Sequence, residues 1–349
     1  MSSEINLRQR GRAMMDFEVS ARQKATAINR VVERELADHG ITAESLPDDM
    51  DARHAAIDTA LAGSVAYRWK HMLGDYCSAE HGRAAVAAFE EARVDLMPII
   101  AQQNQGAVTI DYRPGFEPPA YFARTWFHRT EGGWDGHPQN GFIHGEIVHR
   151  KYVSRVFPGD IYGNRRAVAR LAPRTDYKDI LELGTSSGHY TVALSEVFPD
   201  ARITGLDPSP RMLEQAARVG NALDKDWHLI VGIGEDTGLP DESFDLVTSY
   251  AVHHEIPPKA IEAMFAEAFR VLRPGGTVLM ADVGRYRDLD KLTAWRFDWT
   301  ARYGGEPFWR ATATLDFVPL AEKAGFVDIT AGSMQNGDKY YYIRGSKPA

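Results

Sequence analysis

From about residue 161 onward, short apolar segments alternate with helical ones, and this alternation constrains the fold more than any other feature. Strands are expected at 179–183, 202–207, 227–232, 244–250 and 277–282, with helices at 189–198, 210–220 and 259–272. Two helical stretches near 288–303 and 315–324 precede a last pair of strands at 326–331 and 339–344. This rhythm predicts a doubly wound, mostly parallel α/β sheet of seven strands with right-handed crossovers.

The region before this alternation divides in two. Residues 1–103 have the spacing of helices, and Asp48–Asp49 is expected to cap the second of them. A third helical run, at 81–97, should end or kink at Pro98. Residues 104–160 are crowded with proline, glycine, aromatic residues and histidine, which predicts an irregular connector. We therefore expect a helical N-terminal domain for dimerisation or covering a site, a connector, and a catalytic domain at 161–349.

Composition excludes several classes of protein. The chain carries 40 Lys and Arg against 48 Asp and Glu, a net charge of −8, which disfavours a nucleic-acid partner. The single cysteine, Cys77, excludes an intramolecular disulfide framework and a cysteine-cluster zinc site. The charged N-terminus lacks a secretory signal and no window is apolar enough to span a membrane, so we expect a cytoplasmic protein.

One loop indicates a ligand site. The sequence LELGTSSGHY at 181–190 ends a strand and enters a helix through Gly184 and Gly188. Glycine lets the backbone approach a ligand closely, and ligands of such sheets bind at the carboxyl ends of the strands. Asp207 follows at the end of the next strand, where an acidic residue is placed to hold ribose hydroxyls. Ser186 takes the place of the second glycine, which makes this a poor dinucleotide fingerprint.

Over about residues 165–345, the chain resembles the class I S-adenosylmethionine-dependent methyltransferases, which have a Rossmann-like sheet. The segments that carry the resemblance are ELGTSSG (182–188), GLDPSPRML (205–213), LPDESFDLV (239–247), YAVHHE (250–255) and VLRPGGTVLMAD (271–282). The resemblance implies that S-adenosylmethionine is the cofactor. The position where the family often has an acidic residue for adenine is Ile233, so Glu235 or Asp236 is expected to substitute.

The resemblance also implies which residues surround the cofactor. Glu182, Gly184 and Gly188 would flank its methionine and ribose parts, and Asp207 would bind the ribose hydroxyls. The full set of candidate cofactor contacts is Glu182, Gly184, Thr185, Ser186, Gly188, Asp207, Pro208, Met212, Gly234, Glu235 and Tyr250.

Candidate catalytic residues follow the fourth strand of the alternation. His253 and His254 are expected to act as a base or to orient the acceptor, and Tyr250 to contact the cofactor or donate a hydrogen bond. Ordinary packing of the histidine pair stays open.

A second cluster, His144–Glu146–His149, leaves a metal site, a substrate contact and ordinary packing open. In an α-helix, His149 would lie about 140° round from His144, a poor arrangement for a shared ion, so no metal is expected. The candidate substrate contacts are Trp126, His144, His149, Trp295 and Trp299.

Together these features predict a methyltransferase that acts on a small-molecule acceptor, with oxygen as the leading acceptor atom. Sulfur or nitrogen methylation without a base, and a S-adenosylmethionine-binding protein with another reaction, are the alternatives. Arsenic methylation is not expected, because its usual thiols are missing. The helical extension favours a homodimer.

Overall fold

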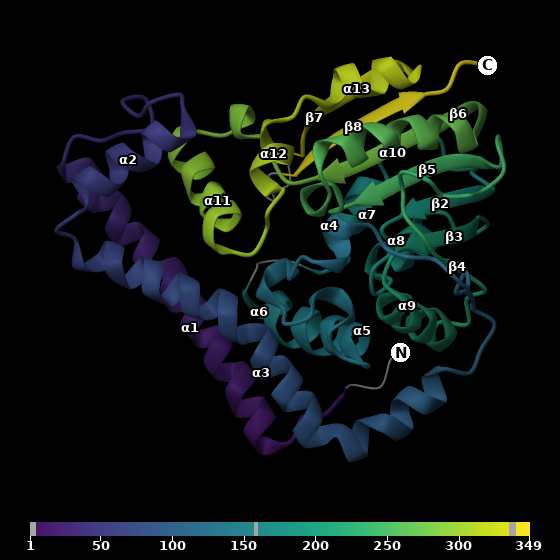
Figure 1. Ribbon diagram of the computed structural model, residues 1–349, viewed down its shortest axis with the longest axis horizontal. Coiled ribbons are helices and arrows are strands. Elements are labelled where there is room, and N and C mark those ends of the chain that lie inside the picture. The colour runs from purple at the N-terminus through teal and green to yellow at the C-terminus, as the bar shows by residue number, and fades with distance from the viewer. Residues whose placement is uncertain (1–4, 157–159, 335–339) are drawn as a thin grey trace.

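The computed structural model describes residues 5–156, 160–334 and 340–349. Within them, an eight-stranded sheet has the order β1-β4-β3-β2-β5-β6-β8-β7 (Figure 1). All neighbouring pairs are parallel except β6 with β8 and β8 with β7. The strands are β1 (Thr109–Asp111), β2 (Asp179–Leu183), β3 (Arg202–Asp207), β4 (His228–Val231), β5 (Phe244–Tyr250), β6 (Leu272–Asp282), β7 (Val327–Ser333) and β8 (Tyr341–Ser346). The predicted mostly parallel α/β fold is confirmed, with one strand more than the seven predicted.

The additional strand, β1, comes from the connector that was expected to be irregular. Its three residues pair with His228–Ile230 of β4 at the edge of the sheet. Turn residues lie on both sides of this strand. Its three residues are too few for the alternation of a strand to be recognised in the sequence. The connector also contains continuous helix, formed by α5 (Asn140–Phe142), the π-helix η3 (Ile143–Val153) and α6 (Ser154–Val156). Part of the last predicted strand, 339–344, begins outside the described residues.

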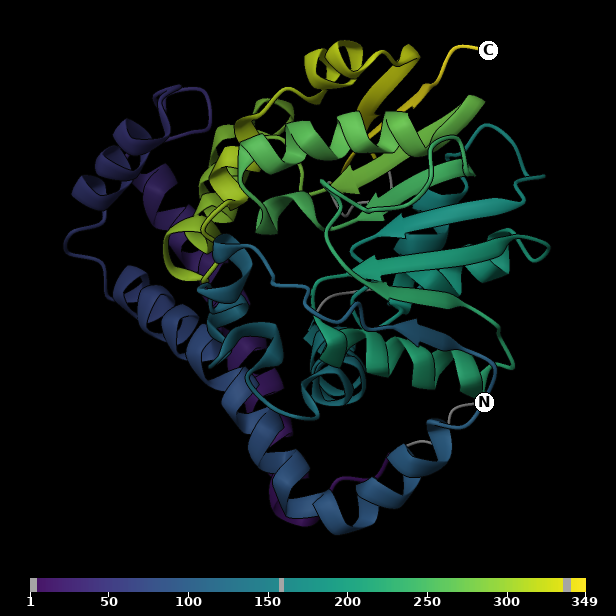
Figure 2. The same ribbon diagram turned by 45° about the vertical axis from the view of Figure 1, so that its right-hand side comes forward.

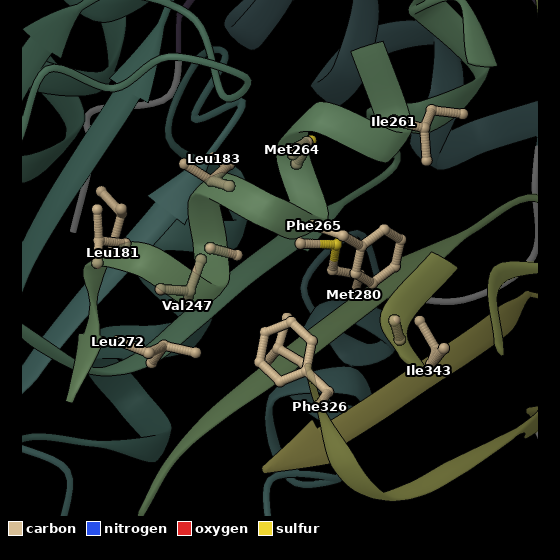
Figure 3. Close-up of a cluster of buried hydrophobic side chains, with 14 of the residues drawn as sticks. Leu181, Leu183, Val247, Ile261, Met264, Phe265, Leu272, Met280, Phe326 and Ile343 are labelled. Atoms are coloured by element: carbon tan, nitrogen blue, oxygen red, sulfur yellow. The ribbon is translucent and has the colours of Figure 1, made fainter. Parts of the chain in front are cut away.

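Helices cover both faces of the sheet, because successive residues of each strand point to opposite faces. Leu181 and Leu183 pack with α10 (Pro258–Val271) and α13 (Phe317–Ala324) in the apolar cluster of Figure 3. Ile180 of the same strand packs on the other face, against a cluster that includes residues of the three helices α7 (Gly163–Ala169), α8 (His189–Val197) and α9 (Pro210–Ala222).

The N-terminal region forms long helices, as predicted. They are α1 (Gln9–Asp38), α2 (Met50–Ala60) and α3 (Val65–Gln103). The carboxylate of Asp49 caps α2 by accepting from the Ala52 N–H at 2.8 Å, so the predicted cap is confirmed. The helix α3 does not end at Pro98, although its last part runs in a different direction from the rest (Figures 1 and 2). No helix of the described residues is long and apolar enough to cross a membrane.

The arrangement of the two regions positions the site. The arrowheads of the parallel strands point toward α1, α3 and α11 in Figure 2, so the carboxyl edge of the sheet faces the N-terminal helices. Trp295 of α11 (Lys291–Tyr303) joins the apolar cluster of α1, α2 and α3. The remaining helical segments are α4 (Ala120–Ala123), η1 (Phe127–Arg129), η2 (Gly133–Asp135), η4 (His253–Glu255), η5 (Tyr286–Asp288) and α12 (Trp309–Thr314).

Candidate active site

A cavity of about 1040 Å³ lies where the carboxyl ends of the strands face the N-terminal helices. Its wall combines residues of the sheet domain, such as Asp207 and His254, with residues of α1 and α3, such as Arg22 and His81. Ligand pockets typically measure 300–1,000 Å³, so the cavity has room for a cofactor together with a small second molecule. The helical region therefore forms part of the site and does not only extend the chain.

The loop after β2 brings backbone atoms to this cavity. Gly184, Ser186 and Gly188 have φ values of +78°, +49° and +85°, which fold the chain into a tight turn before α8. A Cβ on Gly184 would overlap the side chain of Val252, so only glycine fits there. Gly184, Thr185 and Ser186 line the cavity, whereas Gly188 packs against Ala216 of α9.

Asp207 ends β3 with its carboxylate at the cavity wall. Its Oδ2 accepts the Ser186 N–H at 2.8 Å and its Oδ1 accepts the Ser209 N–H at 2.9 Å. Burial raises the pKa of Asp207 to about 7, although both backbone donors favour the ionised form. Each carboxylate oxygen keeps further acceptor capacity for donors in the cavity.

Glu182 is buried beneath the loop and does not line the cavity. Its Oε2 accepts the hydroxyl of Thr191 at 2.6 Å, and its Oε1 has no hydrogen-bond partner among the described residues. Burial raises the pKa of Glu182 to about 8. Glu182 therefore lies behind the loop, and its side chain does not reach the cavity.

The residues expected to surround the adenine ring also line the cavity. Pro208, Met212, Gly234 and Glu235 line it, together with Ile233. The hydroxyl of Tyr121 donates to Oε1 of Glu235, and burial raises the pKa of this carboxyl group. The alternative, Asp236, is exposed and lies outside the wall, so Glu235 is the acidic residue that can substitute at this position.

His254 is the histidine of the pair that faces the cavity. Its Nδ1 lies 2.8 Å from Oδ1 of Asp282, which ends β6. Burial alone would lower the pKa of His254, but the Asp282 carboxylate raises it to about 9. Asp282 therefore fixes the ring and keeps it mainly as an imidazolium at neutral pH.

His253 points the other way, which corrects its prediction as a base or orienting group. Its ring packs in the core, with centroids 5.1 Å from Phe317 and 6.3 Å from Phe265, and it does not line the cavity. Asp282 contacts the main chain of His253, whose N–H donates to Oδ2 at 2.7 Å. Burial lowers the pKa of the ring.

His144 and His149 lie together on the cavity wall, contrary to the separation expected of an α-helix. Their segment is the π-helix η3, in which residues five apart are neighbours along the hydrogen-bond ladder. Their ring centroids are 4.5 Å apart, and His149 stacks on His189 at 4.6 Å. Burial lowers the pKa of His144 to about 3 and that of His149 well below its usual range, so both rings are neutral.

Glu146, the third member of that cluster, faces away from the two histidines. It pairs with Arg150 at 3.2 Å and accepts from Gln215 at 3.4 Å. It does not line the cavity, so the three residues do not converge on one point.

Of the three tryptophans predicted to contact the substrate, one lines the cavity and two do not. Trp299 lines the cavity. Trp126 is 56% exposed and lies outside it, and Trp295 is buried among the N-terminal helices with the Lys70 ammonium 4.7 Å from its ring. The structure therefore gives Trp126 and Trp295 no contact with the space that an acceptor would occupy.

Comparison with known proteins shows which protein family this sequence resembles. Residues 180–276 match the family model described as a methyltransferase domain. The matched segment contains the loop at Gly184, Asp207 and His254. This part of the chain is a class I S-adenosylmethionine-dependent methyltransferase domain.

Individual proteins share the domain without matching over their whole length. An arsenite methyltransferase of Halobacterium salinarum is 36% identical over 124 residues, 35% of this chain and 30% of that protein. A trans-aconitate 2-methyltransferase of Streptomyces coelicolor is 34% identical over 126 residues, 34% of this chain and 41% of that protein. The solved phosphoethanolamine N-methyltransferase 2 of Haemonchus contortus has a TM-score of 0.47 at 17% identity, covering 62% of this chain and 58% of that one. The chain thus spans less than half the length of these two curated relatives.

S-adenosylmethionine fits the methyltransferase domain on the evidence of its own residues. The position of Gly184 admits no side chain, and Asp207 offers acceptor oxygens to ribose hydroxyls. The hydroxyl of Thr185 is buried at the wall without a hydrogen-bond partner among the described residues. These groups form a polar, close-fitting surface of the kind that a nucleoside requires.

Sequence reasoning missed Arg165 and Tyr340 of the wall and the contact of Asp282 with His254. Arg165 of α7 lies with its guanidinium 4.9 Å from the ring of Tyr250, which stacks on Tyr340 at 5.1 Å. All three line the cavity beside the loop. Arg165 precedes the recognisable segments and carries no local signal. Asp282 was visible as the end of a strand, but its pairing with His254 depends on two strand ends lying side by side.

Proposed function

We propose that this chain transfers a methyl group from S-adenosylmethionine to an oxygen atom of a small-molecule acceptor. The observation that carries the proposal is one cavity whose wall includes both Asp207 with the Gly184 loop and His254 with the π-helix histidines. Methyl transfer requires the donor and acceptor to be aligned in a space from which water is excluded. The cavity, walled in part by α1 and α3, provides a space in which donor and acceptor can be aligned.

The cofactor side of the proposal assigns a role to each group. Asp207 accepts from the ribose hydroxyls, the Gly184 backbone allows close approach, and Met212 and Glu235 border the adenine. Tyr250 packs against the cofactor, and Arg165 beside it supplies positive charge for a carboxylate. Bound S-adenosylmethionine supplies an activated methyl group, so the protein mainly has to position the acceptor.

The acceptor side centres on His254. Asp282 fixes its Nδ1, which leaves Nε2 as the nitrogen available to a ligand in the cavity. An imidazolium held in this way can donate its Nε2–H to an acceptor oxygen and orient it toward the methyl group. His144, His149 and Trp299 form further parts of the wall, and the two neutral rings each offer one donor and one acceptor.

Two alternatives differ in the atom methylated or in the reaction. Methylation of a thioether sulfur or a tertiary amine nitrogen would need no proton acceptor, and another S-adenosylmethionine reaction would transfer no methyl group. The arsenite relative suggests a third acceptor, but soft arsenic prefers several thiolates and this chain has only Cys77. We therefore do not propose arsenite.

The first test is calorimetric titration with S-adenosylhomocysteine, with NAD as the control ligand. We expect micromolar binding of the former and none of the latter. Protein that binds is then incubated with methyl-labelled S-adenosylmethionine and a panel of hydroxyl, carboxyl, amine and thiol compounds. Label on an oxygen supports the proposal, and label on nitrogen or sulfur replaces it with the first alternative. Turnover without labelled acceptor supports the second, and absence of cofactor binding contradicts them all.

The expected homodimer and cytoplasmic location stay predictions. Sedimentation analysis of the purified chain tests the first, and fractionation of cells tests the second.

A further inference from the structure

Three residues from distant parts of the chain meet at the cavity wall, outside the groups used above. They are His128 of η1, Glu255 of η4 and Glu306 between α11 and α12. The Nδ1 of His128 pairs with Oε1 of Glu306, and its Nε2 lies 3.3 Å from Oε1 of Glu255. One ligand atom from each residue lies within 4.8 Å of the others, and no other described residues form such a group of three.

Glu306 is unusual for a carboxylate, because its side chain is only 1% exposed. Among the described residues, neither of its oxygens has a donor with hydrogen-bond geometry, and His128 is its ion-pair partner. Burying an ionised carboxylate with so few donors is costly unless a cation compensates it. Glu255 has a hydrogen-bond donor, because its Oε2 accepts the Trp134 indole N–H at 2.9 Å.

The backbone around His128 is held in a strained conformation. His128 and Arg129 have φ values of +53° and +57°, which residues with a side chain rarely adopt. The His128 N–H donates to the Gly305 carbonyl at 3.2 Å, directly beside Glu306 in the chain. Strain of this kind is concentrated at ligand sites and active sites. Here it holds the imidazole between the two carboxylates.

We propose that His128, Glu255 and Glu306 bind one divalent transition-metal ion at the wall of the cavity. One imidazole with two carboxylates is a nitrogen and oxygen set that suits Zn²⁺, Mn²⁺ or Fe²⁺, whereas Mg²⁺ and Ca²⁺ favour oxygen ligands. Two carboxylates also neutralise the charge of a divalent ion. Three protein ligands leave coordination positions open toward the cavity, as in catalytic rather than structural metal sites.

The position suggests what the ion does. Glu255 follows His254 in the chain, and its Oε1 lies 4.0 Å from Nε2 of that ring. An ion held by Glu255 is therefore next to the space assigned to the acceptor, where it holds the acceptor oxygen and stabilises negative charge on it. This role rests on the proposed methyl transfer, whereas binding of the ion does not.

A simpler arrangement competes with this proposal. Burial lowers the pKa of His128, but the two carboxylates raise it well above its usual range. Without an ion, the three residues form an imidazolium held between two carboxylates. That arrangement would only tie η1 to η4 and to the segment before α12.

The test is calorimetric titration of chelator-treated full-length protein with ZnCl₂ at neutral pH. We expect one saturable site of micromolar or tighter affinity, weakened at least tenfold by Glu306→Gln and by His128→Gln. Glu90→Gln is the matched control, because Glu90 pairs with His137 at 2.9 Å at the surface without a second carboxylate near it. It should leave the affinity unchanged. Equal binding by all four proteins would mean adventitious surface binding and would overturn the proposal.

Two further measurements keep the result clear. Titration of the unmodified protein with MnCl₂, followed by the loss of the free-ion electron paramagnetic resonance signal, needs no variant and should also give one site. Absence of binding in both titrations would overturn the proposal in favour of the ion pair. S-adenosylhomocysteine binding is measured on every protein, because retained cofactor binding shows that the variant folds. It also separates failure of the metal site from failure of the proposed function.

Discussion

The carboxylate of Asp282 holds both residues of the histidine pair, but in different ways. Its Oδ1 lies 2.8 Å from the ring nitrogen Nδ1 of His254, and its Oδ2 accepts the backbone N–H of His253. One strand end thereby turns the His254 ring toward the cavity and leaves the His253 ring in the core. Of the two rings, only that of His254 therefore lines the cavity.

Replacing either member of the His254–Asp282 pair should slow methyl transfer without weakening cofactor binding. For His254→Asn we expect kcat to fall about 10²-fold or more, within the range typical for a group acting on the reacting proton or oxygen. Asp282→Asn should give a smaller loss, because it leaves the ring in place but less firmly oriented. Rates are measured with the acceptor found in the labelling screen, and S-adenosylhomocysteine affinity by calorimetry.

The control for this pair is His137→Asn, which alters a histidine bound to a carboxylate outside the cavity. It should leave kcat within about twofold of the unmodified enzyme, the change expected of a surface substitution. An unchanged kcat in His254→Asn would remove His254 from the mechanism.

Cofactor affinity should depend on pH through Asp207. Burial raises its pKa to about 7 in the free protein, and only the ionised carboxylate accepts from both ribose hydroxyls. Cofactor binding therefore favours the ionised form, so affinity should fall about tenfold per pH unit below pH 7 and level off above it. Calorimetric titration with S-adenosylhomocysteine from pH 5.5 to 8.5 measures this.

Asp207→Asn should remove that pH dependence and weaken binding about tenfold or more, since hydrogen bonds to charged groups contribute about 1.5–3 kcal/mol. The control is Asp236→Asn, which alters an exposed aspartate. Its affinity and pH dependence should match those of the unmodified protein. A pH dependence that survives in Asp207→Asn would assign it to another group.

The sequence predicts the sheet domain well because the information there is local. Each strand from β2 to β5 is a short apolar run with its own glycine, proline or capping residue, and the predicted bounds differ by at most one residue. The loop at Gly184 and the position of Asp207 follow from the same local signals. These residues lie on the cavity wall because the carboxyl ends of parallel strands share one edge.

The rest of the site depends on packing between distant segments. The adjacent residues His253 and His254 are indistinguishable in sequence, and only Asp282 and Phe317 decide which ring faces the cavity. His144 and His149 meet because η3 is a π-helix, whereas α-helical spacing would place them on different sides of the helix. His128 and Glu306, nearly 180 residues apart in the chain, give no local signal of their contact.

Glu182 should make the protein less stable as pH rises. Burial raises its pKa from the usual 4.5 to about 8, so the folded state holds a proton that the unfolded state loses above about pH 4.5. The free energy of unfolding should therefore decrease between about pH 5 and pH 8. Glu182→Gln keeps an acceptor for Thr191 and removes this dependence, so the variant should exceed the unmodified protein by a few kcal/mol at pH 9 and match it near pH 5.

Chemical denaturation at several pH values measures this effect, with Glu322→Gln on the exposed face of α13 as the control. The control should follow the unmodified protein at every pH. A Glu182→Gln variant that is less stable at pH 9 would show instead that the charged carboxylate is stabilised in the folded state. If Glu182→Gln also lowers S-adenosylhomocysteine affinity more than tenfold, the carboxylate contacts the cofactor after all.

Gly184→Ala tests whether the close approach of the backbone is needed for the cofactor. The alanine meets two obstacles, a φ of +78° and the side chain of Val252, whereas Gly275→Ala meets a similar φ of +75° in open space. The left-handed conformation costs about 1–2 kcal/mol for an alanine at either site. Gly275→Ala should lose that stability and bind S-adenosylhomocysteine normally, whereas Gly184→Ala should lose more stability and most of its binding.

The double variant Gly184→Ala with Val252→Ala separates the two obstacles. Removing the Val252 methyl groups relieves the overlap but not the backbone strain, so stability should recover toward that of Gly275→Ala. Binding should stay weak in the double variant if the new methyl group occupies space that the cofactor needs, with Val252→Ala alone as the reference. Recovery of full affinity would mean that the glycine is required only for packing against Val252. The cofactor would then not depend on close approach to the backbone at this position.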